Sequence, residues 1–129
     1  MKHRKGKGQS LVEFALALPL LVLLLMGLLD FGRAYFIIVM LNDAAAEGAI
    51  YAGSNPSDVN GIRNRVVESA ADVLIQITPQ DVTVVHSGIA PGASITVTAT
   101  FEFTFLTPFI SNLFGNSLTL RGQAVNPIM

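Results

Sequence analysis

The sequence predicts an α+β fold in which one long apolar helix precedes a small domain containing a second helix and about three antiparallel strands. Two observations carry this prediction. From residue 11 to residue 29, the only ionisable side chain is that of Glu13. From Ile95 to Phe105, apolar residues alternate with threonine and glutamate, which is the pattern of a strand with one buried face. The chain has 129 residues, 51% of them hydrophobic, so one small domain fits beyond the apolar helix.

The apolar run is long enough to cross a membrane. As a helix, the residues from 11 to 29 would extend about 29 Å, which is close to the thickness of a bilayer core. The flanking charges are unequal, since Asp30 and Arg33 cancel after the run and four cations precede it: Lys2, Arg4, Lys5 and Lys7. The positive-inside rule therefore predicts a single-pass protein with a cytoplasmic N-terminus and an extracytoplasmic C-terminal domain.

A cleaved secretory signal is the main alternative for this N-terminus. The run is longer than the usual apolar region of a signal peptide, which has about 7–15 residues. It is followed by Asp30 and Arg33 instead of a small-residue cleavage site, and the alanines from 44 to 46 lie too far downstream. These features favour a retained helix.

The helix is expected to continue beyond the apolar run, because residues 34–52 contain no proline and are rich in alanine. A helix from about Ser10 to Ala52 would be about 65 Å long. Pro19 should kink this helix or loosen one of its turns, because proline removes an internal hydrogen bond.

Small residues three and four positions apart form a patch near the end of this helix. Such spacing permits close packing of another element against the helix. Two partners fit equally well: the sheet of the same chain, or a helix of a neighbouring subunit. The candidate packing residues are Ala45, Gly48, Ala49 and Ala52, with Ala44 beside them.

The rest of the chain is expected to form a helix followed by a β-meander. After a turn at residues 53–56, Ser57 or Asp58 can cap a helix that runs to about Gln76. Its apolar face would comprise Val59, Ile62, Val66, Ala70, Val73, Leu74 and Ile77. Strands are predicted at about residues 81–86, 95–105 and 117–125.

The connection between the last two strands, residues 106–116, is unusually apolar. It contains Phe109, Ile110, Leu113 and Phe114. Such residues most often cover the core of their own domain. The alternative is a docking patch for another subunit, with Phe109 and Phe114 as the candidate residues.

No pattern in the sequence indicates catalysis, a cofactor or a metal site. His3 lies in the basic N-terminal tail, and His86 has no cysteine or acidic cluster around it in the sequence. No nucleophile and base stand in a known arrangement, so we do not expect an enzyme. The formal net charge of −1 does not suggest nucleic-acid binding. Cysteine is absent, which excludes disulfide bonds.

Glu13 is exceptional because ionisable groups in a membrane span usually face a partner or water. One interpretation is a carboxylate that reaches the headgroups of the lipid. The other is that Glu13 pairs with a cation of a neighbouring helix.

Four segments around Glu13 and beyond resemble the TadE-like minor pilins, or pseudopilins, of the Tad (Flp) type IV pilus machinery. The resemblance implies cleavage by a prepilin peptidase between Gly8 and Gln9, with Glu13 and Phe14 aiding recognition and assembly. It also implies assembly through an inner-membrane platform and a secretion ATPase into a pilus for surface attachment or secretion. The segments are Gly8-Gln9-Ser10-Leu11-Val12-Glu13-Phe14-Ala15, Leu18-Pro19-Leu20, Asp30-Phe31-Gly32-Arg33-Ala34 and Asn42-Asp43-Ala44-Ala45-Ala46-Glu47-Gly48-Ala49.

The resemblance implies three parts: a basic leader at 1–8, a long helix at 9–53 with its span at 11–29, and an exported domain at 54–129. Cleavage would give Gln9 a cationic amine, with which Glu13 of a neighbouring subunit could pair and set the register. Major pilins of this branch are usually shorter, which favours an accessory role. The alternative function is a permanently anchored extracytoplasmic binding protein that never polymerises.

Overall fold

The computed structural model describes residues 5–72 and 75–129 and confirms the predicted α+β class. The predictions for residues 1–4, and for Val73 and Leu74, concern positions outside the described residues. The elements, in chain order, are α1 (Lys5–Ser54), α2 (Val59–Ala70), the 3-10 turn η1 (Pro79–Asp81), β1 (Val82–His86), β2 (Ser94–Thr104), α3 (Pro108–Phe114) and β3 (Ser117–Pro127).

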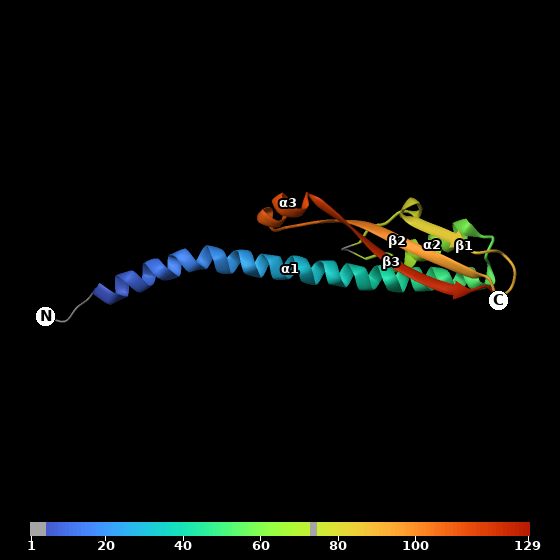
Figure 1. Cartoon of the computed structure of the whole chain (residues 1–129), viewed down its shortest axis with the longest axis horizontal. Coiled ribbons are helices and arrows are strands. Elements are labelled where there is room, and N and C mark those ends of the chain that lie inside the picture. The colour runs from blue at the N-terminus through green and yellow to red at the C-terminus, as the bar shows by residue number, and fades with distance from the viewer. Residues whose placement is uncertain (1–4, 73–74) are drawn as a thin grey trace.

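Helix α1 is a single element of 50 residues, which corresponds to about 75 Å. It is longer at both ends than expected and remains helical through Pro19. Its N-terminal part is inclined to the rest of the helix (Figure 1). A bend without a break is a common effect of a proline inside a helix, because the ring displaces one turn and removes one hydrogen bond.

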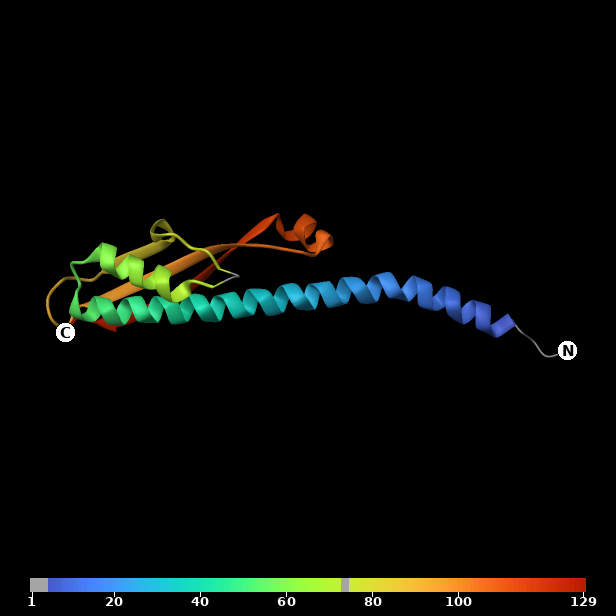
Figure 2. The same cartoon turned by 180° about the vertical axis from the view of Figure 1, so that it is seen from behind.

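The C-terminal half of α1 and the shorter helix α2 pack on a three-stranded antiparallel sheet with the order β1-β2-β3 (Figure 2). In the register, Val84 of β1 lies opposite Val97 of β2, and Val97 lies opposite Ala124 of β3. Helix α1 contacts β2 and β3, whereas α2 contacts α1 and β1. The N-terminal half of α1 extends beyond this domain (Figure 1).

Strand β2 supplies the centre of the core, as its alternating sequence predicts. Its fully buried side chains are those of Ile95, Val97, Ala99 and Phe103. Phe101 is only half-buried. Fully burying a side chain such as Ile95, Val97 or Phe103 stabilises the fold by about 1.5–3 kcal/mol, so the strand anchors α1 to the sheet.

Two glycines allow the close approach of α1 to the rest of the domain. A Cβ at Gly48 would overlap the side chain of Val66 in α2, and a Cβ at Gly122 would overlap the backbone of Leu41 in α1. The backbone N–H of Gln123 then donates to Oδ1 of Asn42 at 3.0 Å. Strand β3 therefore lies directly on the helix backbone.

The prediction for the end of the second helix was wrong. Helix α2 ends at Ala70 instead of Gln76, and the N–H of Ala71 bonds to the carbonyl of Glu68. Beyond it, Asp72 and Ile75 exchange two backbone hydrogen bonds. Ile75 and Ile77 reach the core from this non-helical segment, which explains why their spacing resembled a continued helix.

The interpretation of residues 106–116 as a cover for the core was also wrong. The segment forms α3, which contains no buried residue. Phe109 is 63% exposed and Phe114 is 72% exposed. Ile110 is half-buried, and its Cδ1 lies 3.7 Å from the position of a Cβ on Gly27. Helix α3 therefore lies beside α1 outside the domain core.

Candidate functional site

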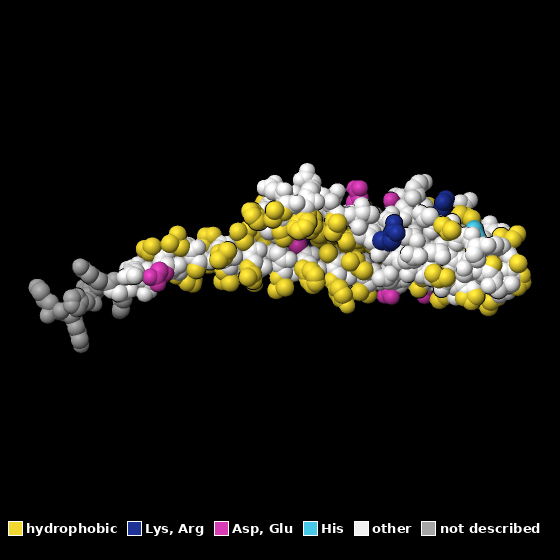
Figure 3. All heavy atoms as spheres, viewed as in Figure 1, with side chains coloured by type: hydrophobic (Ala, Val, Ile, Leu, Met, Phe, Trp, Pro, Cys, Tyr) yellow, Lys and Arg dark blue, Asp and Glu magenta, His cyan; other side chains and the backbone are white. Residues whose placement is uncertain are grey.

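The N-terminal half of α1 is a bare apolar rod. Leu11, Leu16 and Leu20 are 69%, 74% and 70% exposed, and the most apolar stretch of the helix contains no buried residue. In the described part of the chain, α1 is the one helix that is long and apolar enough to cross a membrane. The apolar side chains line this half of the molecule in Figure 3. Such a surface requires lipid or other apolar helices around it.

The predicted junction residues lie together at the start of this rod. The bond between Gly8 and Gln9 is inside α1, and a Cβ on Gly8 would meet no atom within 4 Å. Nε2 of Gln9 donates to Oε1 of Glu13 at 3.2 Å, one helical turn away. Glu13 is exposed, and Phe14 is 61% exposed. All four residues are therefore accessible to another protein.

The small-residue patch lies at the opposite end of α1. Ala45, Gly48, Ala49 and Ala52 are buried inside the chain's own domain. Gly48 faces Val66 of α2 and Val97 of β2. The patch therefore presents no surface to a neighbouring subunit in this conformation.

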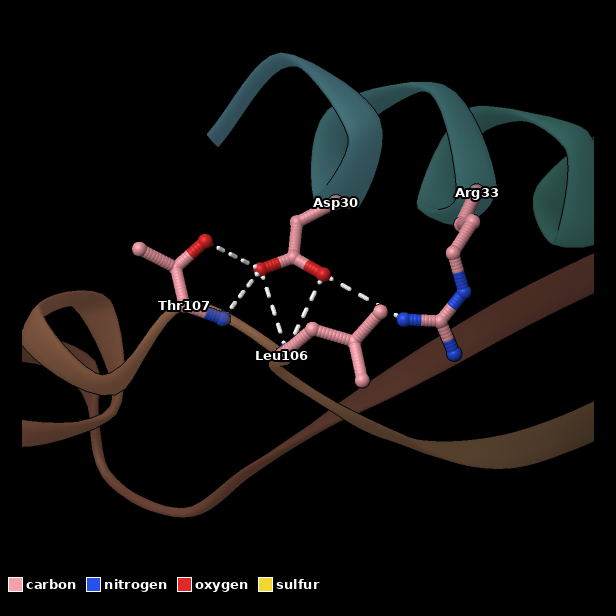
Figure 4. Close-up of polar contacts among 4 residues, drawn as sticks. All are labelled: Asp30, Arg33, Leu106 and Thr107. Carbon is pink, nitrogen blue, oxygen red and sulfur yellow. Dashed lines mark hydrogen bonds and ion pairs between the residues drawn. The ribbon is translucent and has the colours of Figure 1, made fainter. Parts of the chain in front are cut away.

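A buried carboxylate joins α1 to the segment that leads into α3 (Figure 4). Asp30 is 2% exposed and follows the apolar run directly. The N–H of Leu106 donates to Oδ1 and Oδ2 at 3.0 and 3.1 Å. The N–H and the hydroxyl of Thr107 donate to Oδ2 at 2.9 and 2.7 Å. We call this arrangement the Asp30 clamp.

Arg33 completes the clamp from the next turn of α1. Its Nη1 lies 3.2 Å from Oδ1 of Asp30, so the two charged residues that follow the apolar run form an ion pair. Its guanidinium also lies 5.0 Å from the ring centroid of Phe103. An ionised carboxylate only accepts hydrogen bonds, so these donors match Asp30 and offset the cost of its burial. The clamp fixes the start of α3 to the end of the apolar run.

No sequence pattern indicates Thr107 or its hydrogen bonds to Asp30, because 77 positions separate the two residues. An acidic residue at the end of an apolar run can be exposed to water, paired with a nearby cation or buried against another segment, so its position alone predicts no partner. The Thr107-Pro108 pair indicates a turn or a helix start, but it identifies no distant acceptor.

A second carboxylate fixes the corner between α1 and α2. Asp58 accepts hydrogen bonds from the N–H of Gly61 and from the hydroxyl of Tyr51, both at 2.9 Å. These two hydrogen bonds, of which that from Gly61 has the larger effect, hold the pKa of Asp58 below its ordinary value of 3.8. Asp58 is thus the N-cap of α2, one of the two caps expected.

Within residues 5–72 and 75–129, no group of three or more histidines, acids or cysteines is placed to hold a metal ion. His86 instead hydrogen-bonds through Nε2 to the carbonyl oxygen of Pro56 at 2.8 Å. The polar clusters at Asp30 and Asp58 hold backbone segments in place.

Together, the fold and these sites define an α+β protein with one long apolar helix, which is exposed along its N-terminal half and built into a small domain along its C-terminal half. A family model described as TadE-like protein matches residues 8–49, which confirms the resemblance over this part of the chain. Over these residues the chain is similar to a structural family of Tad pilus-associated membrane proteins, and its apolar helix fits a membrane anchor. No curated protein and no solved structure matches the chain.

Proposed function

We propose that this protein is a pilin-like subunit that is stored in the membrane, cleaved by a prepilin peptidase and assembled into or with a Tad-type pilus. The bare N-terminal half of α1 is the observation that carries the proposal. Its exposed apolar side chains suit lipid before assembly and other helices afterwards. The N-terminus would lie in the cytoplasm, and residues 54–129 would lie outside and become part of an extracellular pilus.

In this mechanism, cleavage between Gly8 and Gln9 changes the charge at the start of α1. The amide of Gln9 becomes a cationic amine, which the exposed Glu13 of a neighbouring subunit can accept as a partner. In the uncut chain, Glu13 already accepts a hydrogen bond from the side chain of Gln9, and that chain has no amine at this position. Pairing would therefore favour cleaved subunits and set their register.

The domain would be carried on the surface of the assembly. Phe109 and Phe114 remain candidate residues for docking between subunits, because both are exposed. The other partners are the inner-membrane platform and, indirectly, the secretion ATPase. Surface attachment and secretion are the two uses proposed for the assembled pilus.

The cleavage step is tested by the intact mass of the chain purified from membranes with and without an active prepilin peptidase. We expect a peptidase-dependent product that begins at Gln9, and we expect Gly8→Val to abolish it. Gly6→Val is the matched control, since a Cβ at either glycine of α1 meets no neighbouring atom. An uncut chain in both samples would contradict the proposal and favour a permanently anchored binding protein.

The assembly step is tested with Glu13→Gln, which keeps the shape of the side chain and removes its charge. We expect normal cleavage but at least a roughly tenfold loss from sheared filaments, which corresponds to about 1.4 kcal/mol. Glu47→Gln is the control, because Glu47 is also exposed on α1 but lies beside the domain. Equal recovery of both variants in filaments would exclude the pairing role of Glu13.

A further inference from the structure

We propose that α3 and the preceding Leu106 form a second membrane contact, inserted into the lipid leaflet on the domain side, beside the point where α1 leaves the bilayer. This inference rests on the proposed membrane span of α1. The occupant of the exposed apolar surface of α3 in the stored subunit is bilayer lipid.

The position of α3 along α1 is the first argument. Ile110 lies against Gly27, three residues before Asp30 and within the apolar run. Three residues correspond to about 4.5 Å along a helix, so α3 reaches back beside the last turn of the span. When the run from 11 to 29 is in the bilayer, α3 is at its surface.

The chemistry of α3 is the second argument. No charged residue occurs between Glu102 and Arg121. The surface is continuous with apolar side chains of α1 at the same level, as Figure 3 shows. Large apolar side chains that are more than half exposed here include Leu106, Phe109, Leu113 and Phe114 on the α3 side, and Leu24, Leu28 and Leu29 on α1. A patch of this kind beside a span favours lipid.

Several polar groups at the start of α3 are hydrogen-bonded within the chain, which lowers the cost of insertion at the interface. The Asp30 clamp accepts the N–H groups of Leu106 and Thr107. The carbonyl of Thr107 in turn accepts the N–H groups of Ile110 and Ser111, and the hydroxyl of Ser111 donates to the carbonyl of Pro108. Interfacial helices enter about 5–10 Å into the boundary between headgroups and acyl chains, and α3 needs no greater depth.

The absence of tryptophan from the sequence permits a direct test with single-tryptophan variants of the full chain. Phe114→Trp reports on α3. Ile89→Trp is the matched control in the loop between β1 and β2, because both native side chains are 72% exposed. Leu21→Trp reports on the span itself. Each variant is placed in phosphatidylcholine vesicles at high dilution, with and without lipid brominated near the glycerol end of its acyl chains.

We expect bromolipid to remove most of the emission of Phe114→Trp and Leu21→Trp, and almost none of that of Ile89→Trp. Quenching at Leu21→Trp without quenching at Phe114→Trp overturns the inference and leaves the proposed function intact. No quenching at Leu21→Trp overturns the membrane span and both proposals with it. If the emission of Phe114→Trp shifts with the protein-to-lipid ratio and is not quenched by bromolipid, the exposed surface of α3 contacts a second copy of the chain. This result also overturns the inference.

Discussion

Replacing Asp30 by alanine removes the acceptor on which the segment before α3 depends. Three donors lose their partner: the N–H of Leu106, the N–H of Thr107 and the hydroxyl of Thr107. Thr107 is 2% exposed, so water does not replace the carboxylate while the segment stays in place. Arg33 is affected less, because its side chain is 32% exposed.

The free-energy cost of the substitution is estimated from these unpaired donors. Each buried donor without a partner costs about 1–3 kcal/mol, and losing the ion pair with the partly exposed Arg33 adds about 0–1 kcal/mol. The segment can relieve part of the cost by detaching from α1. We therefore expect Asp30→Ala to favour detachment by about 3–4 kcal/mol, which raises the detached population roughly 10²–10³-fold.

Amide hydrogen exchange of the full chain in lipid nanodiscs measures this population. In Asp30→Ala, exchange at Leu106 and Thr107 should accelerate by the same factor, whereas exchange at Val97 in the centre of β2 should not change. Asp43→Ala is the control, because Asp43 is an exposed acid on the same helix.

Acceleration of less than about tenfold at Leu106 and Thr107, equivalent to about 1.4 kcal/mol, would show that the carboxylate does not hold the segment. Faster exchange at Val97 as well would show that the variant unfolds the domain instead of opening the clamp. Asp30→Asn keeps one acceptor oxygen and should give an intermediate acceleration.

Three further predictions concern the domain. Gly122→Ala should destabilise it by about 1–3 kcal/mol in chemical denaturation, because the new methyl group meets the backbone of α1, whereas Gly32→Ala, with open space around it, should not; equal effects would refute the close contact. Phe103→Ala should cost about 3–5 kcal/mol because Phe103 is fully buried, and Phe109→Ala should change stability little because it is exposed; the reverse order would move the core to α3. Asp58→Ala should lower the Tm at neutral pH. The difference in Tm from the native chain should vanish as the pH falls through the lowered pKa of Asp58 in the folded state, since a protonated Asp58 no longer stabilises the cap. A difference in Tm that persists in strong acid would contradict this cause.

Local patterns in the sequence were sufficient to predict most of the fold. The alternation along β2 is confirmed by the burial of Ile95, Val97 and Phe103, and the cap at Asp58 is where its residue type suggested. The end of α2 could not be predicted. Ile75 and Ile77 fit a helical spacing, but they enter the core from a non-helical segment whose course depends on the tertiary packing.

The candidate site could be predicted only where it is local. Gly8, Gln9 and Glu13 lie within two turns of one helix, so the sequence order determines their proximity. The Asp30 clamp depends on where β2 ends relative to α1, and no local pattern encodes that distance. The exposure of Phe109 and Phe114 was missed for a related reason, since apolar residues in a connection can face either the core or the outside.

Helix α3 lies beside Gly27 and so makes one side of α1 different from the others. A rod that is apolar on all sides can turn about its own axis against identical neighbours without losing contact area. At the level of Gly27, α3 covers one side of α1. Helices of neighbouring subunits can therefore approach α1 at this level only from the other sides. Each subunit in an assembly would therefore have to point α3 in an equivalent direction, and this requirement limits the helical symmetries that the bare half of α1 can adopt.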